Sequence, residues 1–435
     1  MKMQGLSLET IPPIHIPFRF FLTAPWMGIV AGLALLLGSD QAFSSQWTPE
    51  LRAVTHLLTL GFMAMVMLGA MFQLVPVISG HLIPGGTKVA GLVHVLLSVG
   101  VLLLVAGFYW QAYALMGWAA LLLLLAFAVF LLALATLLRH RIGGDSIFSI
   151  RFAALALLTT VGLGLWLSAS YAGLTTPPAL ANKATVHMAW GIGGWVLLLV
   201  MGASYQVIPM FHVTPSYPSL LARGLPTTVF VSLLTLTLVQ LPEVQALAVL
   251  AFCAAAMTYA IFSIHLLGQR KRKLADITAR FWRLSLVCLL LSALLATGLY
   301  FTDDPLPSPG IRHQLQVVLG TLMIYGFAIS VIMGMLQKIV PFLSYLHLQR
   351  SCLSNFALLK TLPHMGEIIP ASRSRWQFNL HIAALLTLLA GITTDQATTP
   401  AAILVTADFA WLSFSLISAT ALYHNTAQRI TSSGG

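Results

Sequence analysis

The sequence predicts an all-α, polytopic membrane protein of twelve transmembrane helices, arranged as three parallel four-helix repeats with pseudo-threefold symmetry. Three observations support this: the composition, a series of apolar runs, and a motif that occurs three times. Hydrophobic residues make up 58% of the chain and charged residues only 8%. A soluble domain carries about 25% charged residues, because its surface must be hydrated. We therefore expect most of the surface to face lipid, with residues 1–435 forming a single transmembrane domain.

The charge and the cysteines exclude two other classes of protein. The net charge is +11, but the basic residues are scattered between hydrophobic runs, which argues against a nucleic-acid interface. The three cysteines Cys253, Cys288 and Cys352 show neither the spacing of a metal site nor the number of a disulfide framework.

The apolar runs predict the individual helices. About 20 apolar residues are needed to cross the hydrocarbon core. On that criterion the spans lie near 17–38, 53–78, 89–110, 112–137, 149–172, 184–210, 223–241, 244–267, 280–301, 313–342, 376–395 and 400–423.

Basic residues predict how these helices are oriented, because they concentrate in cytoplasmic loops. If the N-terminus is cytoplasmic, the opposite side holds only Arg52, Lys183 and Arg312. The cytoplasmic side then holds Lys2, Lys88, Arg139, Arg141, Arg151, Arg223, Arg270, Lys271, Arg272, Lys273, Arg280, Arg283, Arg350, Lys360, Arg373, Arg375 and Arg429. We expect a multi-pass protein of a bacterial-type inner (plasma) membrane, with both termini cytoplasmic.

One motif recurs at a fixed period on the second helix of each predicted set of four. It places two glycines eight residues apart and a proline seven residues after the second glycine: Gly61, Gly69, Pro76; Gly194, Gly202, Pro209; Gly326, Gly334, Pro341. The copies lie 133 and 132 residues apart. Small residues at this spacing let neighbouring helices approach closely, and a proline near a helix end leaves a free carbonyl that water can satisfy.

A second marker recurs at a similar period. The pairs Arg19-Phe20, Arg151-Phe152 and Arg280-Phe281 each open the first helix of a set. The repeats then cover approximately 17–137, 149–267 and 280–423. Each predicted repeat has four helices, which is an even number, so each repeat enters the membrane in the same direction. The repeats are therefore parallel.

Each motif helix is preceded by a histidine near its extracytoplasmic start: His56, His187 and His313. A histidine inside a membrane span is costly unless it has a partner, and imidazole is a common ligand of haem and metals. We predict these three as ligands of a cofactor or metal. A wet interfacial position is the alternative, and it applies most strongly to His313, which lies far from its motif and beside Arg312.

Four other polar residues lie in or near predicted spans. His94 and His381 fit either a second ligand pair or hydrogen-bonded core residues. Asp408 fits a proton carrier, a partner for a histidine, or a link to a neighbouring helix. Lys338 replaces the glutamine of the other motif copies and fits a lysine that snorkels to the cytoplasmic face.

Three methionines follow His56 along one helix: Met63, Met67 and Met71. Their thioethers suit copper(I), but methionine is also an adaptable core residue. Copper binding and ordinary packing both remain open here.

The histidine-led second helix, His56 through Gly61-Phe62 and Gly69 to Pro76, and its repetition resemble the haem-copper oxidase subunit I superfamily. That resemblance implies three arcs of four helices, with redox ligands on helices 2, 6, 7 and 10. The opening Pro17-Phe18-Arg19-Phe20-Phe21 and the stretch His56-Leu57-Leu58-Thr59-Leu60-Gly61-Phe62 are more specifically similar to the NnrS branch. Members of that branch are haem-containing membrane proteins linked to nitric oxide stress.

The chain departs from the oxidases at two places. Residues 223–241 lack the histidine pair that holds copper on helix 7, and only His313 stands before helix 10. The resemblance thus implies b-type haem with His56 as axial ligand, a second ligand open between His187 and His313, and an incomplete binuclear centre. Arg52 and Arg312 become candidates to pair with haem propionates.

Two classes of function follow. One is a haem protein of redox or gas-binding function, a candidate oxidoreductase served by a membrane or periplasmic electron-transfer partner. The other is a haem-free transporter for copper or a small solute, since parallel repeats also occur in transporters. Prolines near helix ends rather than mid-membrane favour the first class.

Overall fold

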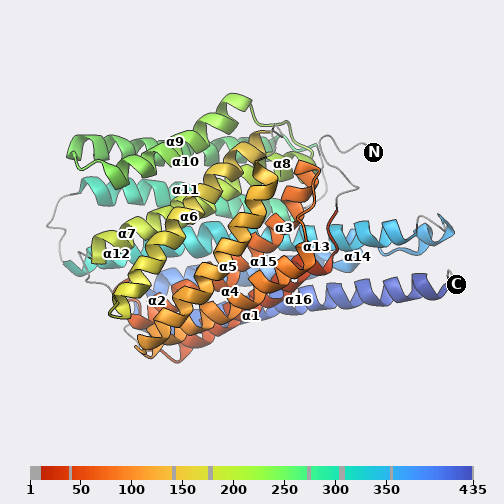
Figure 1. The fold of residues 1–435 in the computed structure, drawn as a ribbon, viewed down its shortest axis with the longest axis horizontal. Coiled ribbons are helices and arrows are strands. Elements are labelled where there is room, and N and C mark those ends of the chain that lie inside the picture. The colour runs from red at the N-terminus through yellow and green to blue at the C-terminus, as the bar shows by residue number, and fades with distance from the viewer. Residues whose placement is uncertain are drawn as a thin grey trace.

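The computed structural model describes residues 11–38, 42–139, 144–174, 180–271, 276–302, 309–352 and 356–433. Within these ranges every regular element is a helix (Figure 1). Of the residues used to predict orientation, Lys2, Arg141, Arg272 and Lys273 lie outside the described residues.

The helices fall into thirds along the chain. The first third comprises α1 (His15–Leu36), α2 (Pro49–His56), η2 (Leu57–Ala64), α3 (Met65–Ser79), α4 (Gly86–Tyr109) and α5 (Ala114–Leu138). The middle third comprises α6 (Asp145–Tyr171), α7 (Leu180–Met188), η3 (Ala189–Val196), α8 (Leu197–His212), α9 (Ser219–Leu238) and α10 (Pro242–Gly268). The last third comprises α11 (Ile277–Phe301), α12 (Pro309–Thr321), η4 (Leu322–Ile329), α13 (Ser330–Ser351), η5 (Phe356–Thr361), α14 (Met365–Ile368), α15 (Ala371–Gly391), η6 (Asp395–Ala397) and α16 (Thr398–Ser433).

Within the described residues, 11 helices are long and apolar enough to cross a membrane. The predicted helix 11 corresponds to α15, which has 21 residues but is not among the eleven. Its first turns carry Arg373 and Arg375, and its apolar character begins only after His381. The structure therefore supports a multi-pass helical membrane protein.

Three helices form the inside of the bundle. They are Pro49–Ser79 (α2, η2, α3), Leu180–His212 (α7, η3, α8) and Pro309–Ser351 (α12, η4, α13), called here the inner helices. The share of their apolar segments that is buried is 78%, 61% and 67%, whereas it does not exceed 50% in the other eight. All three run in the same direction, with α2, α7 and α12 at one end of the bundle (Figure 1).

Each inner helix changes winding at the same place in its motif. The π-helical segments η2, η3 and η4 span eight residues each, and each contains the first glycine of the motif. A π-helical turn is rare and is frequently found at functional sites. The wider winding frees a carbonyl, and in η4 a side chain from the neighbouring helix bonds there: Ser285 Oγ donates to the Phe327 carbonyl oxygen at 2.8 Å.

The motif glycines are where the inner helices meet the first helix of each third. A Cβ on Gly69 would lie 2.6 Å from Phe20 Cβ of α1, and one on Gly334 would lie 2.5 Å from Phe281 Cβ of α11. In the middle third, a Cβ on Gly202 would lie 3.1 Å from Ile150 of α6. At Gly69 and Gly334 only glycine permits this approach, and at Gly202 a Cβ would be tightly packed; this is the close packing expected of small residues in membrane helices.

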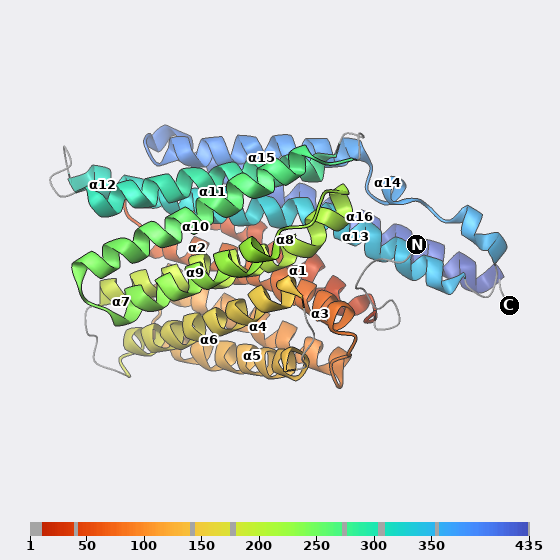
Figure 2. The same ribbon diagram turned by 90° about the horizontal axis from the view of Figure 1, so that it is seen from above.

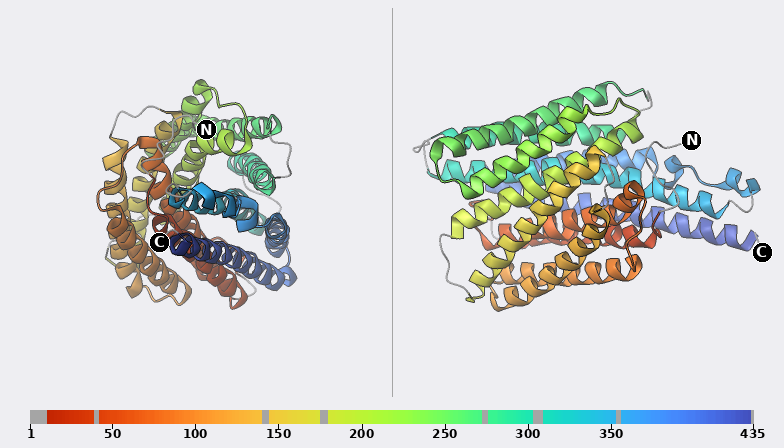
Figure 3. Two further views of the ribbon diagram at one scale, coloured as in Figure 1. Left: turned by 90° about the vertical axis from the view of Figure 1, so that its right-hand side faces the viewer. Right: turned by 45° about the horizontal axis from the view of Figure 1, so that its top comes forward.

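The outer helices close into a ring around the inner ones. The last helix of each third packs against the first helix of the next: α5 on α6, α10 on α11, and α16 on α1. Seen along the bundle, the three thirds occupy different sectors (Figure 3, left).

Two helices extend beyond the bundle, and here the predicted boundaries were too short. The span predicted to end at 342 continues to Ser351, so Pro341 lies inside α13 rather than at its end. Likewise α16 runs to Ser433 instead of 423. The two extensions lie side by side (Figure 2) and form their own small core from Leu348, Cys352 and Ile430. This pairing stabilises helix beyond the apolar runs, which no hydropathy pattern records.

Candidate functional site

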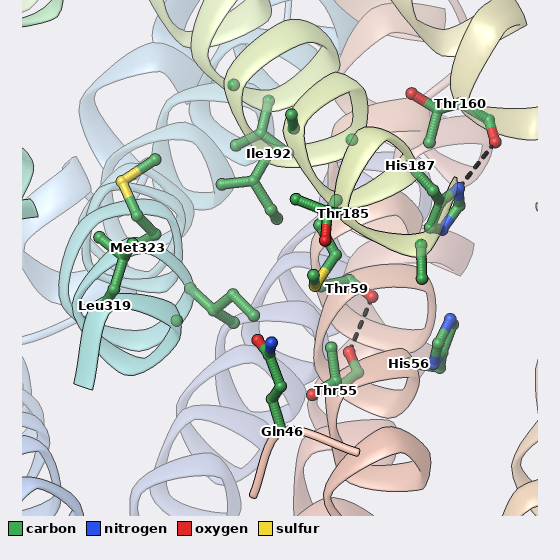
Figure 4. Close-up of a pocket in the computed structure, with 18 of the residues that line it drawn as sticks. Gln46, Thr55, His56, Thr59, Thr160, Thr185, His187, Ile192, Leu319 and Met323 are labelled. Carbon is green, nitrogen blue, oxygen red and sulfur yellow. Dashed lines mark hydrogen bonds between the residues drawn. The ribbon is translucent and has the colours of Figure 1, made fainter. Parts of the chain in front are cut away.

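A cavity of about 1280 Å³ lies between the inner helices at the end where α2, α7 and α12 begin. All three thirds contribute to its wall, most of which is apolar. Figure 4 shows His56 and His187 on one side of this cavity, with Leu319 and Met323 of the last third on the opposite side. Its volume exceeds the range of about 300–1,000 Å³ that is usual for small-molecule sites.

His56 ends α2, directly before the π-helical segment. Helix α2 starts at a favourable sequence, because the Thr48 side chain caps it and Pro49 occupies its first turn. The Nδ1–H of His56 donates to the carbonyl oxygen of Arg52 at 2.7 Å. The ring also stacks on Phe108 of α4, with 5.0 Å between ring centroids. These contacts fix both the tautomer and the plane of the ring.

His187 reaches the same cavity from α7. Its Nδ1–H donates to the carbonyl oxygen of Thr160 on α6 at 3.0 Å (Figure 4). That carbonyl is open to the ring because Gly164, one turn later on α6, has no side chain. A Cβ on Gly164 would lie 3.0 Å from His187 Cε1.

The two histidines thus share one chemical state. In each ring Nδ1 carries the proton and donates it to a backbone carbonyl oxygen in a hydrogen bond, so Nε2 keeps its lone pair. Both side chains are half-buried, both line the cavity, and Nε2 has no hydrogen bond in the part of the chain that the structure describes. A ligating histidine characteristically has its second ring nitrogen bonded in this way, which orients the ring and increases its basicity.

His313 is placed differently. Its side chain is exposed, and it is not among the residues that line the cavity. Its helical neighbours Arg312 and Gln316 do line the cavity. Gln316 accepts a hydrogen bond of 3.3 Å from Gln46, which joins α12 to the segment before α2.

The charge on the cavity wall has one sign. Its charged residues are Arg52 and Arg312, and no Asp or Glu occurs among the described lining residues. Arg52 donates to the Tyr171 hydroxyl at 2.7 Å and lies over the rings of Phe108 and Tyr171, yet its Nε is buried without a partner among the described residues. Arg312 donates to the carbonyls of Thr302 and Leu299. The wall therefore suits a ligand that is largely apolar with anionic groups at its edge.

No cluster of three or more His, Cys, Asp or Glu side chains occurs among the described residues. The methionines proposed for copper are all buried, and Met67 and Met71 line a second, apolar cavity of about 170 Å³ between the inner helices. His56 and His187 do not line that cavity. Met67 and Met71 are thus not gathered with His56 and His187 around one cavity.

His94 and His381 occupy comparable but separate positions. Each ring contacts the phenylalanine of an Arg-Phe pair, His94 at 5.3 Å from Phe20 and His381 at 5.6 Å from Phe281, measured between ring centroids. His94 Nε2 lies 2.9 Å from the Thr23 hydroxyl, which makes it a hydrogen-bonded core residue.

His381 belongs to a buried polar cluster in the last third. Asp408 of α16 is at its centre: Oδ2 accepts from Tyr325 Oη at 2.6 Å and lies 2.8 Å from His381 Nδ1. Gln377 donates to Asp408 Oδ1 at 2.5 Å and to its carbonyl oxygen at 2.8 Å. Ser330 Oγ lies 2.7 Å from His381 Nε2. The sequence left three functions open for Asp408, and in the structure Asp408 contacts a histidine, His381.

Lys338 forms an ion pair with Asp276 at the other end of the bundle. Its ammonium lies 3.3 Å from Asp276 Oδ2, and His212 Nδ1 lies 3.5 Å from the same oxygen. Burial raises the pKa of Asp276, but the nearby His212 and the Lys338 charge lower it more, so the net pKa lies below its usual range. Asp276 also caps α11 by accepting from Thr278 N at 3.0 Å.

Sequence reasoning missed the residues that orient the histidines. Thr160, Gly164, Phe108 and Tyr171 lie on other helices and have no distinctive spacing relative to His56 or His187. Tyr325 was also missed, although its position one residue before the Gly326 motif glycine is a signal that could have singled it out.

The comparisons with known proteins add no relative. A scan against models of protein families finds no match, and a search of curated proteins finds none either.

Proposed function

We propose that this chain is a haem-binding integral membrane protein of redox or gas-binding function, related to haem-copper oxidase subunit I and most similar to its NnrS-like branch. The observation that carries the proposal is the pair His56 and His187. Both line one large apolar cavity, and both hold Nδ1–H on a backbone carbonyl with Nε2 unpartnered among the described residues.

We also propose that α15 is a twelfth transmembrane span and that the three thirds of the chain are repeats related by pseudo-threefold symmetry. Two facts support this: η2, η3 and η4 fall at the same motif position, and the motif glycines pack in each third on its first helix.

The described residues fit a haem better than a bare metal ion. A bare zinc or copper centre takes three or four protein ligands, and no such cluster occurs among the described residues. Haem iron brings its own ring nitrogens and needs only one or two ligands from the protein, which His56 and His187 would supply. The apolar wall suits the macrocycle, and Arg52 with its unpartnered Nε suits a propionate.

Each residue then has a defined task. Arg52 O and Thr160 O hold the two imidazoles in the ligating tautomer, and Phe108 holds the plane of His56. Bound there, haem would supply one-electron transfer or a binding position for nitric oxide or oxygen. His313 is exposed and apart from the cavity, so we assign the second ligand to His187. With two histidines and no third at the described wall, the proposal excludes a complete oxygen-reducing binuclear centre.

We further propose that both termini are cytoplasmic in an inner (plasma) membrane. The end of the cavity near Arg52 and Arg312 then lies on the outer side of the membrane. There it would be open to a membrane or periplasmic electron-transfer partner. The alternative is a haem-free transporter that uses the cavity for copper or a small solute.

One experiment separates these functions. The protein is purified from cells supplied with haem and copper, and its oxidised and dithionite-reduced spectra, pyridine haemochrome and metal content are measured. Stoichiometric b-type haem with a sharp Soret band is expected. A colourless preparation without haem, or one holding copper alone, would overturn the proposal in favour of the transporter.

A further inference from the structure

A cluster of five side chains is buried among η4, α13, α15 and α16, outside the histidine site. Asp408, His381 and Ser330 are 0% exposed, and Tyr325 and Gln377 are 1% exposed. Such a group in a membrane bundle is costly to maintain and is a functional candidate by default. We propose that this cluster is a proton-binding site which holds one exchangeable proton and communicates with the large cavity through Tyr325.

The charges of the cluster require this proton. An ionised Asp408 accepts from the Tyr325 hydroxyl, the Gln377 amide and His381 Nδ1, all of them neutral groups if His381 is neutral. The cluster would then carry an uncompensated buried charge, which costs several kcal/mol. One added proton on Asp408 makes the cluster neutral.

The hydrogen bonds accommodate both states. Without the added proton, the Ser330 hydroxyl donates to His381 Nε2, which is 2.7 Å away. With the added proton on Asp408 Oδ2, this bond and the bond from His381 Nδ1–H to Oδ2 are both kept, and Oδ2–H donates to Tyr325 Oη. Rotation of the Tyr325 hydroxyl thus lets the site gain or lose a proton without leaving a donor or acceptor of His381 unpaired.

Tyr325 provides the connection to the cavity. Its side chain lines the cavity, its hydroxyl donates to Asp408 Oδ2 at 2.6 Å, and its ring stacks on His381 with centroids 4.7 Å apart. A proton arriving at Tyr325 Oη from the cavity displaces the hydroxyl proton to Asp408 Oδ2, so the cluster gains one proton and Tyr325 stays neutral. Release is the reverse.

The surroundings contain no competing ionisable group within hydrogen-bonding distance in the described chain. From α11, Phe281 faces His381, and the Cys288 thiol faces Gly326. On α15 the guanidinium of Arg373 lies over the ring of Phe414, 4.8 Å from its centroid. On α13, Lys338 is engaged with Asp276.

A second interpretation can be excluded on geometry. The order Ser330, His381, Asp408 is the connectivity of a hydrolytic triad. However, Ser330 is fully buried and lines neither of the two cavities described above, so no acyl substrate can reach its hydroxyl.

The test uses the full-length protein in lipid bilayers with ¹³C-labelled aspartate carboxyls and ¹⁵N-labelled histidine rings, observed by solid-state NMR between pH 5 and 9. The Asp408 signal is assigned by its loss in Asp408→Asn, and the His381 signals by their loss in His381→Gln. We expect the Asp408 carboxylate in the wild type to change in one step to a protonated carboxyl group as the pH is lowered. His381 should keep one protonated ring nitrogen throughout, and His94 should be unaffected.

Tyr325→Phe tests the connection while changing little in volume. It should slow hydrogen–deuterium exchange at the Asp408 carboxyl group at least tenfold and leave the exchange of the His94 ring unchanged. An Asp408 carboxyl group whose protonation does not change, or a doubly protonated His381, would overturn the site. Equal exchange in Tyr325→Phe would overturn the path. Neither readout needs haem, so failure here is distinguishable from failure of the proposed function.

Discussion

His56 Nδ1 and the carbonyl oxygen of Arg52 lie 2.7 Å apart, so a single helical turn fixes both the tautomer of the candidate ligand and the place of its neighbouring cation. The same turn directs the Arg52 side chain to Tyr171 on α6. Ligand and cation are thus positioned together by α2, and changes to either have separable consequences.

We predict that His56→Gly and His187→Gly each abolish stoichiometric haem retention, because each removes a ligand that protein packing cannot replace. Imidazole added to the purified variant should restore a Soret band, since the lost side chain leaves room for it. His94→Gly is the matched control: its ring bonds Thr23, and its haem content should equal that of the wild type. Unchanged haem and spectrum in His56→Gly would refute the ligand assignment.

Gly164→Leu should displace the His187 ring without replacing any polar side chain. Even a Cβ at this position lies 3.0 Å from His187 Cε1, so a larger side chain must push the ring off the Thr160 carbonyl. We expect a shifted Soret band and a marked loss of haem. Gly162→Leu, on the same helix with nothing within 4 Å of its Cβ, should behave like the wild type. Equal spectra in the two variants would mean that His187 is not an axial ligand.

Arg52→Gln should weaken haem binding while keeping the His56 tautomer, because His56 bonds the backbone of Arg52 and not its side chain. A lost charge-assisted hydrogen bond is worth about 1.5–3 kcal/mol, or roughly a 10- to 100-fold change in dissociation constant. Haem titration of the apoprotein measures this. Affinity within about twofold of the wild type would remove Arg52 from the site.

Gly334→Ala should destabilise the bundle by about 1–3 kcal/mol, the usual cost of overpacking. Its new Cβ would lie 2.5 Å from Phe281 Cβ, at the junction of α13 and α11. Thermal denaturation in detergent checks the effect. Gly320→Ala on α12, where nothing lies within 4 Å, serves as control and should be neutral. A neutral Gly334→Ala would show that the motif glycine does not govern helix approach.

Asp276→Asn should lower stability by about 1–3 kcal/mol at pH 7, since it removes the charge that Lys338 binds but keeps a side chain able to cap α11. Asp276→Ala loses the cap as well and should be less stable still. The pKa of Asp276 is lowered in the folded protein, so its contribution is complete above the unfolded carboxyl pKa near 3.8 and is lost as the pH falls through the lower folded pKa. The difference in melting temperature between wild type and Asp276→Asn should therefore shrink below about pH 4. A difference that stays constant from pH 7 to pH 3 would contradict the ion pair.

Much of the fold was predictable because a bilayer leaves few choices. Every backbone polar group in lipid must bond within its own helix, so a long apolar run dictates both a helix and its approximate length. Of the predicted helices, α4 and α5 begin and end within a few residues of the expected positions. The motif glycines likewise proved to be sites of close approach, because a missing Cβ has a direct steric meaning. The extension of α13 to Ser351 was missed, since it depends on α16 lying beside it.

The site was predictable only in its outline. His56 and His187 stood out because imidazole is expensive in lipid, and they do line one cavity, whereas His313 does not. Their hydrogen-bond partners Arg52 O and Thr160 O are backbone atoms, which carry no residue-type signal. The contact of Asp408 with His381 joins α16 to α15, and nothing in either apolar run specifies their relative rotation.

The sequence by itself determined that the chain forms apolar helices long enough to cross a membrane, where most of these helices lie, and which polar residues are out of place in lipid. Those features follow from local composition and period, because transfer into the bilayer acts on each segment separately. Only the tertiary structure decided which helices lie inside, which nitrogen of each histidine is free, and that Tyr325, His381 and Asp408 meet. These depend on the packing of segments far apart in the chain, where side-chain shape and backbone carbonyls set the contacts.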